Sequence, residues 1–71
     1  MNATLKNANL KNAILRKSDL RRADLRKSDL RKADLTKANA QQANFVDAKL
    51  AGITLTKAKL KSAKGIVGAL R

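Results

Sequence analysis

The chain has 71 residues, of which 17 are Lys or Arg and five are acidic, giving a formal net charge of +12. It contains no histidine and no cysteine, so an imidazole base, a thiolate nucleophile, a Cys/His zinc site and a disulfide are excluded. A chain of this length makes one small domain. We therefore expect no enzyme activity and no catalytic, cofactor-binding or metal-binding residues.

A five-residue repeat fills almost the whole chain. Leucine falls on nearly every fifth position from Leu5 to Leu60, and Ala40 is the one small residue in that register. The residue two positions before each of these is small, with Ile53 as the exception. The sequence is therefore one unit repeated twelve times over residues 3–62.

A period of five fits neither an α-helix nor one continuous strand. On a helix, residues five apart differ by roughly 140°, so the leucines would spiral around the cylinder. On a strand they would alternate between the two faces. The period instead predicts a short extended stretch followed by a turn, which coils the chain around its own leucines. Abundant Ala, Leu, Lys and Arg keep a helix as the alternative, although a recurring Asp or Asn before the leucine favours turns.

The units Ala23 to Lys27 (Ala-Asp-Leu-Arg-Lys) and Ala33 to Lys37 (Ala-Asp-Leu-Thr-Lys) resemble the pentapeptide repeat family, whose units read Ala-(Asp or Asn)-Leu-x-x. The resemblance implies an all-β fold, a right-handed quadrilateral β-helix with four units per coil and about three coils. It also implies that the leucine and the small residue point inward. Members are mostly not enzymes, and the best-known ones are acidic DNA mimics that bind DNA gyrase or topoisomerase IV.

The register of the repeat breaks at Gly65. We therefore expect a pentapeptide-repeat solenoid over residues 1–62, with its twelve units at 3–62, and a C-terminal cap or docking tail over residues 63–71. A disordered terminus is the alternative for the tail. Solenoid ends expose apolar and hydrogen-bonding groups unless they are capped. End-to-end self-association is therefore a further alternative.

Basic residues gather in consecutive units of the first half, at outward positions. We call these nine residues the basic belt. The belt consists of Arg16, Lys17, Arg21, Arg22, Arg26, Lys27, Arg31, Lys32 and Lys37. With four units per coil, as the resemblance implies, the belt surrounds the solenoid near the boundary of the first two coils. We expect Arg21, Arg22, Arg26 and Arg31 to lie at the contacts with a partner.

The belt predicts a small basic scaffold or linker protein that binds acidic protein subunits of a multi-protein complex. Nucleic acid is the alternative partner, because phosphates attract Lys and Arg without any base reading. The chain has no Tyr or Trp and its one Phe falls at an inward position, so the stacking surface of single-strand binders is missing. A DNA mimic must be negative, so the gyrase-binding role is not carried over. The charge could also serve solubility alone.

The sequence shows no secretory signal, lipidation motif or membrane-spanning segment. The apolar pair Ile66-Val67 near the end of the sequence is flanked by glycine on both sides. We expect a cytoplasmic protein that does not insert into a membrane.

Overall fold

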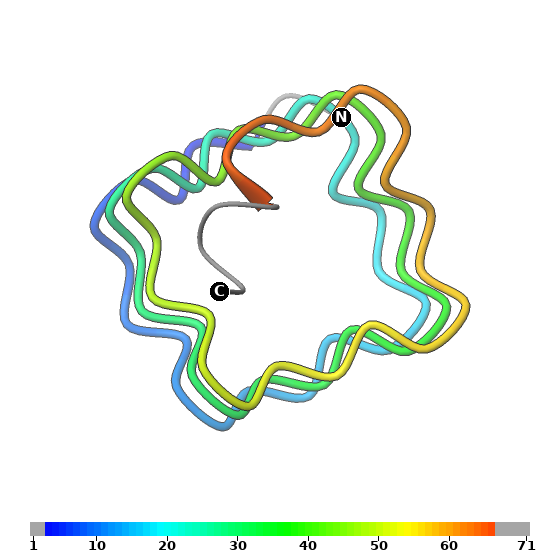
Figure 1. Cartoon of the computed structure of the whole chain (residues 1–71), viewed down its shortest axis with the longest axis horizontal. Coiled ribbons are helices and arrows are strands. Elements are labelled where there is room, and N and C mark those ends of the chain that lie inside the picture. The colour runs from blue at the N-terminus through cyan, green and yellow to red at the C-terminus, as the bar shows by residue number, and fades with distance from the viewer. Residues whose placement is uncertain (1–2, 67–71) are drawn as a thin grey trace.

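The computed structural model describes residues 3–66, which wind into a right-handed quadrilateral β-helix of three coils (Figure 1). Four units complete one circuit, so residues twenty apart pair in parallel: Thr4 with Asp24, and Asp24 with Asn44. The all-β fold predicted from the period and the resemblance is confirmed, and the helical alternative is wrong for the repeat units. Nowhere in the described part of the chain is there a helix that could cross a membrane.

The sides of the coils pair through single residues and not through long strands. The second residue of each unit makes the parallel bridge, beginning at Thr4, and the pairing continues to Lys64. Around each bridge, backbone hydrogen bonds join neighbouring coils: the Leu5 N–H donates to the Asp24 carbonyl at 2.7 Å, and the Asp24 N–H donates to the Ala3 carbonyl at 2.9 Å. The extended stretch is this short because a turn follows in every unit.

The fourth and fifth residues of each unit form a corner of the square. In the first unit, the Ala8 N–H donates to the Leu5 carbonyl at 3.0 Å, and Lys6 and Asn7 lie between them. The φ angle of Asn7 is 62°, and the fifth residue has a positive φ, between 56° and 73°, in all twelve units. Positive φ at the third turn residue alone fits a type II turn. Eleven of these twelve residues are not glycine, and none is β-branched.

A side-chain hydrogen bond supports most corners. Wherever the second residue of a unit is Asp or Asn, its Oδ1 accepts the backbone N–H of the fourth residue. In the second unit, for example, Asn9 accepts from Lys11 at 3.2 Å. The Asp or Asn that the repeat places before its leucine therefore has a local structural role.

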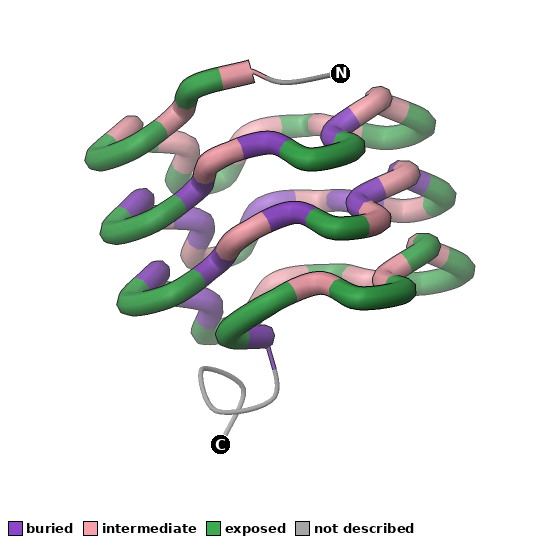
Figure 2. The backbone as a smooth tube through the Cα atoms, turned by 90° about the horizontal axis from the view of Figure 1, so that it is seen from above, coloured by how far each residue is buried: buried purple, intermediate pink, exposed green. Residues whose placement is uncertain are grey.

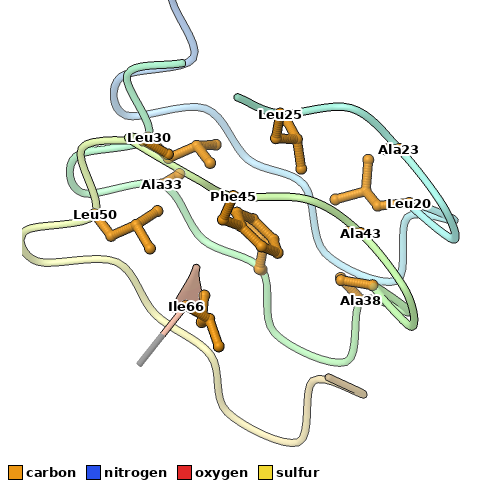
Figure 3. Packing of buried hydrophobic residues seen from close by; sticks show 13 residues of the cluster. Leu20, Ala23, Leu25, Leu30, Ala33, Ala38, Ala43, Phe45, Leu50 and Ile66 are labelled. Carbon is orange, nitrogen blue, oxygen red and sulfur yellow. The ribbon is translucent and has the colours of Figure 1, made fainter. Parts of the chain in front are cut away.

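The core consists of stacked columns of inward side chains, most deeply buried in the middle coil and at the start of the third. Leu25, Leu30, Leu35 and Phe45 are fully buried, and they pack with the small residues of the repeat (Figure 3). Towards the two ends of the solenoid the burial decreases, as the colours of Figure 2 show, and Leu5, Leu10, Leu15, Leu55 and Leu60 are only partly buried. The hydroxyl of Ser28, which replaces the usual alanine, donates to the Leu25 carbonyl at 2.6 Å. No polar side-chain atom buried within residues 3–66 lacks a partner.

After the last unit the chain turns across the end of the third coil. Gly65 has a φ of 76° and lies against the backbone of Val46. The next residue, Ile66, is only 8% exposed and joins the buried cluster. Residues 67–71 lie outside the described part, so the cap or docking tail expected over residues 63–71 stays a prediction.

Candidate functional site

Stacking of the coils gives the solenoid four faces, one unit wide. Face 1 contains residues 3–7, 23–27, 43–47 and 63–64; face 2 contains 8–12, 28–32 and 48–52; face 3 contains 13–17, 33–37 and 53–57; face 4 contains 18–22, 38–42 and 58–62. The second residue of each unit points outward on the face, and the fourth and fifth form the corner that follows, the fourth on the side of its own face. Every predicted belt residue therefore has a defined place on a face or at a corner.

The nine belt residues all lie at corners and fall into two sets. Those at the fourth position are Arg16, Arg21, Arg26 and Arg31, and those at the fifth position are Lys17, Arg22, Lys27, Lys32 and Lys37. All are exposed except Arg31, which is partly buried. The Lys17 N–H donates to the Thr36 carbonyl at 2.9 Å, so Lys17 and Lys37 lie at the same corner in neighbouring coils. The fifth-position set thus visits each of the four corners.

Three fourth-position arginines form bidentate ion pairs within their own units. The pairs are Arg21 with Asp19, Arg26 with Asp24, and Arg31 with Asp29. In the second pair, Nε and Nη2 of Arg26 donate to the two carboxylate oxygens of Asp24 at 2.8 and 2.7 Å. The backbone N–H of Arg26 also donates to Asp24, at 3.1 Å. One aspartate therefore fixes both the corner and the guanidinium that follows it.

The remaining fourth-position arginine is paired between coils. Nε of Arg16, in the first coil, donates to Oδ2 of Asp34, in the second coil, at 2.6 Å. Asp34 also accepts the Thr36 hydroxyl and, at 3.0 Å, the Thr36 backbone N–H. Both oxygens of this carboxylate are thus engaged within face 3.

These hydrogen bonds lower the pKa of each paired carboxyl group. The Arg26 side chain, and then its backbone N–H, hold the pKa of Asp24 at about 2, below the ordinary 3.8. At Asp34 the Thr36 hydroxyl acts first and Arg16 second, and the pKa is again about 2. The pKa is likewise lowered to about 2 at Asp29 and further still at Asp19. All four carboxylates are ionised at neutral pH and each offsets one arginine charge.

The uncompensated charge of the belt therefore lies at the fifth positions. Nine belt cations less four paired aspartates leave a charge of +5, which equals the number of fifth-position belt residues. Among these, Nε of Arg22 donates to the neutral Gln42 at 2.8 Å. Within residues 3–66 no lysine nitrogen lies within 4.0 Å of a carboxylate, because every ion pair there involves an arginine.

The sequence predicts partner contacts at Arg21, Arg22, Arg26 and Arg31. In the structure Arg21, Arg26 and Arg31 pair with aspartates of their own units, and Arg22 donates to the neutral Gln42. The recurring Asp-Leu-Arg triplet, at residues 19–21, 24–26 and 29–31, was the available signal. This triplet could be interpreted as an ion pair only once the structure showed that the second and fourth residues of a unit lie side by side.

Fold and repeat together define a β-solenoid of pentapeptide units, and the comparisons agree. A family model described as pentapeptide repeats matches in eight copies, over residues 3–39 and 33–64. The chain therefore belongs to the pentapeptide repeat family, whose members are generally non-catalytic repeat proteins.

One solved structure that the chain resembles is the pentapeptide repeat protein Rfr23 from the cyanobacterium Cyanothece 51142. The two chains are 34% identical, with a TM-score of 0.37, and the match covers 86% of this chain. This chain spans 48%, about half, of the length of that protein. A search of curated proteins gave no match.

Proposed function

We propose that this chain is a non-enzymatic scaffold or linker whose basic belt binds acidic protein surfaces within a larger assembly. The observation that carries the proposal is the ring of uncompensated cations at the fifth positions, which occupies all four corners near the boundary of the first two coils. A ring presents cations to an acidic surface on any side of the solenoid. Long-range attraction between such opposite charges favours the encounter.

A protein partner is favoured over nucleic acid because the outward surface offers no stacking groups. The only aromatic residue of the chain, Phe45, is fully buried. Single-stranded nucleic acids are usually held by aromatic stacking together with a basic groove. Binding to phosphates alone is the second candidate function, which the same ring of cations supports.

We propose that the protein acts in the cytoplasm and that it is not an enzyme. The chain lacks the histidine and cysteine on which most acid–base, nucleophilic and zinc chemistry depends. Four aspartates, Asp19, Asp24, Asp29 and Asp34, are held as ion-pair partners of belt arginines. A lack of cysteine fits a reducing compartment.

The test is retention of tagged protein in its native assembly, with two variants that each remove five charges. The belt variant replaces the fifth-position residues: Lys17→Gln, Arg22→Gln, Lys27→Gln, Lys32→Gln and Lys37→Gln. The control variant removes exposed lysines elsewhere: Lys6→Gln, Lys11→Gln, Lys49→Gln, Lys59→Gln and Lys61→Gln. Glutamine suits the fifth position, since Gln42 occupies it with a φ of 63°.

We expect the belt variant to lose retention by about tenfold or more and the control variant to lose clearly less. Nuclease treatment should leave the wild-type assembly intact. Release by nuclease, with a steep linear loss of affinity against the logarithm of salt concentration, would favour the nucleic-acid alternative. Equal losses in the two variants would show that only total charge matters and would overturn the role of the belt.

A further inference from the structure

We propose that face 3, with the lysine corner that follows it, is the surface on which the acidic partner docks. The partner surface would have an uncharged centre and a row of Asp or Glu side chains along one edge. This inference rests on the proposed function and adds to it the face, the orientation and the chemistry of the contact.

Face 3 is the one face whose second and fourth positions carry no uncompensated cation. At the second and fourth positions, faces 1, 2 and 4 each carry two unpaired lysines. These are Lys6 and Lys64, Lys11 and Lys49, and Lys59 and Lys61, respectively. On face 3 the only charged residues at these positions are Arg16 and Asp34, and they pair with each other. A partner that covers face 3 therefore desolvates no unpaired charge, whereas covering any other face buries two.

The centre of face 3 also has an apolar and hydroxyl character that the fold does not require. Ile14 is 79% exposed, at a second position where the other seven units of the first two coils have Thr, Asn or Asp. Ile14 cannot accept the N–H of Arg16, so this corner lacks the side-chain hydrogen bond that Asp or Asn supplies elsewhere. Below it lie Thr54 and Thr56, both exposed. The corner makes no hydrogen bond to this side chain, and burial by a partner would remove its exposed apolar surface from water.

The corner that follows face 3 carries a lysine in every coil. We call Lys17, Lys37 and Lys57 the lysine column; they are spaced by the distance between neighbouring coils, about 4.8 Å. Backbone bonds hold the column in register, because the Lys37 N–H donates to the Thr56 carbonyl at 2.8 Å. The opposite corner of face 3 has only Lys32, between Asn12 and Gly52. The charge around face 3 is therefore one-sided, and it sets the orientation of an acidic edge.

The same charges argue against a second copy of this chain as the occupant. The only carboxylate of face 3 and its two corners is Asp34, which is engaged with Arg16 and Thr36. Two such faces brought together would oppose lysines to lysines or to neutral residues. Nucleic acid would gain nothing from covering Ile14, and its phosphates would find more cations on faces 1, 2 and 4.

The size of the face sets the strength of the contact. The Cα atoms span 21 × 20 × 19 Å, so a face offers at most about 400 Å², half of what one partner contributes to a standard interface. Docking through face 3 alone should therefore be weak and salt-sensitive, and the affinity should depend strongly on Ile14 and the lysine column.

Lysine acetylation of the native assembly tests the inference. The tagged protein is recovered with its assembly from nuclease-treated extract of its own cells, treated with acetic anhydride, and compared with the free protein by mass spectrometry. The eleven lysines lie on all four faces and serve as internal reporters. We expect labelling of the lysine column to fall roughly fivefold or more, with less than twofold change at Lys11, Lys49, Lys59 and Lys61.

A second arm uses single substitutions at matched positions. Ile14→Lys and Asn9→Lys each add one cation at the second position of a first-coil unit, on face 3 and on face 2. Attraction to total charge predicts stronger retention in both variants. Docking on face 3 predicts about five- to tenfold weaker retention for Ile14→Lys alone. Ile14→Asn should also weaken retention. This variant gains the corner hydrogen bond that Asn9 makes in the neighbouring unit, so a loss of folding cannot explain the effect.

The outcomes separate the two proposals. Recovery of the protein without any partner after nuclease treatment overturns the proposed function and this inference with it. Protection confined to lysines of faces 1, 2 or 4, or stronger retention of Ile14→Lys, overturns this inference alone and leaves the belt as the binding element.

Discussion

Replacing Gly65 by alanine tests whether the chain that follows the last unit holds the end of the solenoid. The matched control is Gly52→Ala. Both glycines have a positive φ, 76° at Gly65 and 73° at Gly52, so the backbone strain that alanine introduces is the same, about 1 kcal/mol. The two sites differ in what the new methyl group meets.

At Gly52 an added Cβ would lie 3.3 Å from Cγ of Lys32, a flexible side chain that can move away. At Gly65 it would lie 2.7 Å from N and 2.8 Å from Cα of Val46, which is backbone. The segment must therefore shift and draw Ile66, now 8% exposed, out of the core. Exposing an isoleucine costs about 2 kcal/mol. We expect a loss of unfolding free energy of about 1 kcal/mol for Gly52→Ala and about 3 kcal/mol for Gly65→Ala.

Urea unfolding followed by far-UV circular dichroism measures this difference, since the chain has no Trp or Tyr for fluorescence. Ile66→Ala, which keeps the backbone and removes most of the apolar contact, should lose about 2 kcal/mol. Equal losses for the two glycine variants, within about 0.5 kcal/mol, would refute the reasoning. The end of the third coil would then be stable without Ile66.

Three further results are expected from the same unfolding assay. Lys37→Val, which puts a β-branched residue at positive φ, should lose about 1–2 kcal/mol, and Lys11→Val, at a fourth position, should change little. Leu30→Ala, in the buried middle coil, should lose about 3 kcal/mol and Leu10→Ala, in the same column of an end coil, about 1 kcal/mol; equal losses would contradict the gradient of burial. Side-chain hydrogen bonds from Arg26, from Arg31 and from Thr36 with Arg16 hold the pKa values of Asp24, Asp29 and Asp34 near 2, below the ordinary 3.8. Stability should therefore be constant above roughly pH 5, fall as the pH drops toward 2, and fall less in Asp29→Asn.

The inward half of the fold was predictable because hydrophobic periodicity turns one leucine of each unit inward, while the resemblance to pentapeptide repeats supplied four units per coil. A leucine at every fifth residue admits few compact paths, and stacking at intervals of twenty residues follows once four units make a coil. Leu5, Leu25 and Phe45 share one column because of this arithmetic. The prediction did not need to know what the outward side chains do.

The contacts between outward side chains could not be predicted from the sequence in the same way. They depend on the geometry of the corners, which the repeat pattern does not specify. Asp24 and Arg26 are two residues apart, and only the extended stretch followed by a type II turn brings their side chains together. Positive φ at every fifth residue had a visible trace in the sequence, namely Asn7, Asn12 and Gly52 and the lack of β-branched residues there. This residue pattern can be assigned to a positive φ only once the turn type is known.

The division of roles among the five positions shows where function can be sought in such a chain. The first and third residues fill the core and the fifth must accept a positive φ, so the fold constrains all three. The second residue serves the fold when it is Asp or Asn, because it then accepts a corner N–H. Ile14 gives up that bond and buries little of itself in return. Since the fold accounts for the second residues on either side of it, Asn9 and Asp19, the departure at Ile14 points to a contact outside the chain. It also singles out face 3 over the three faces that carry exposed lysines at their second or fourth positions.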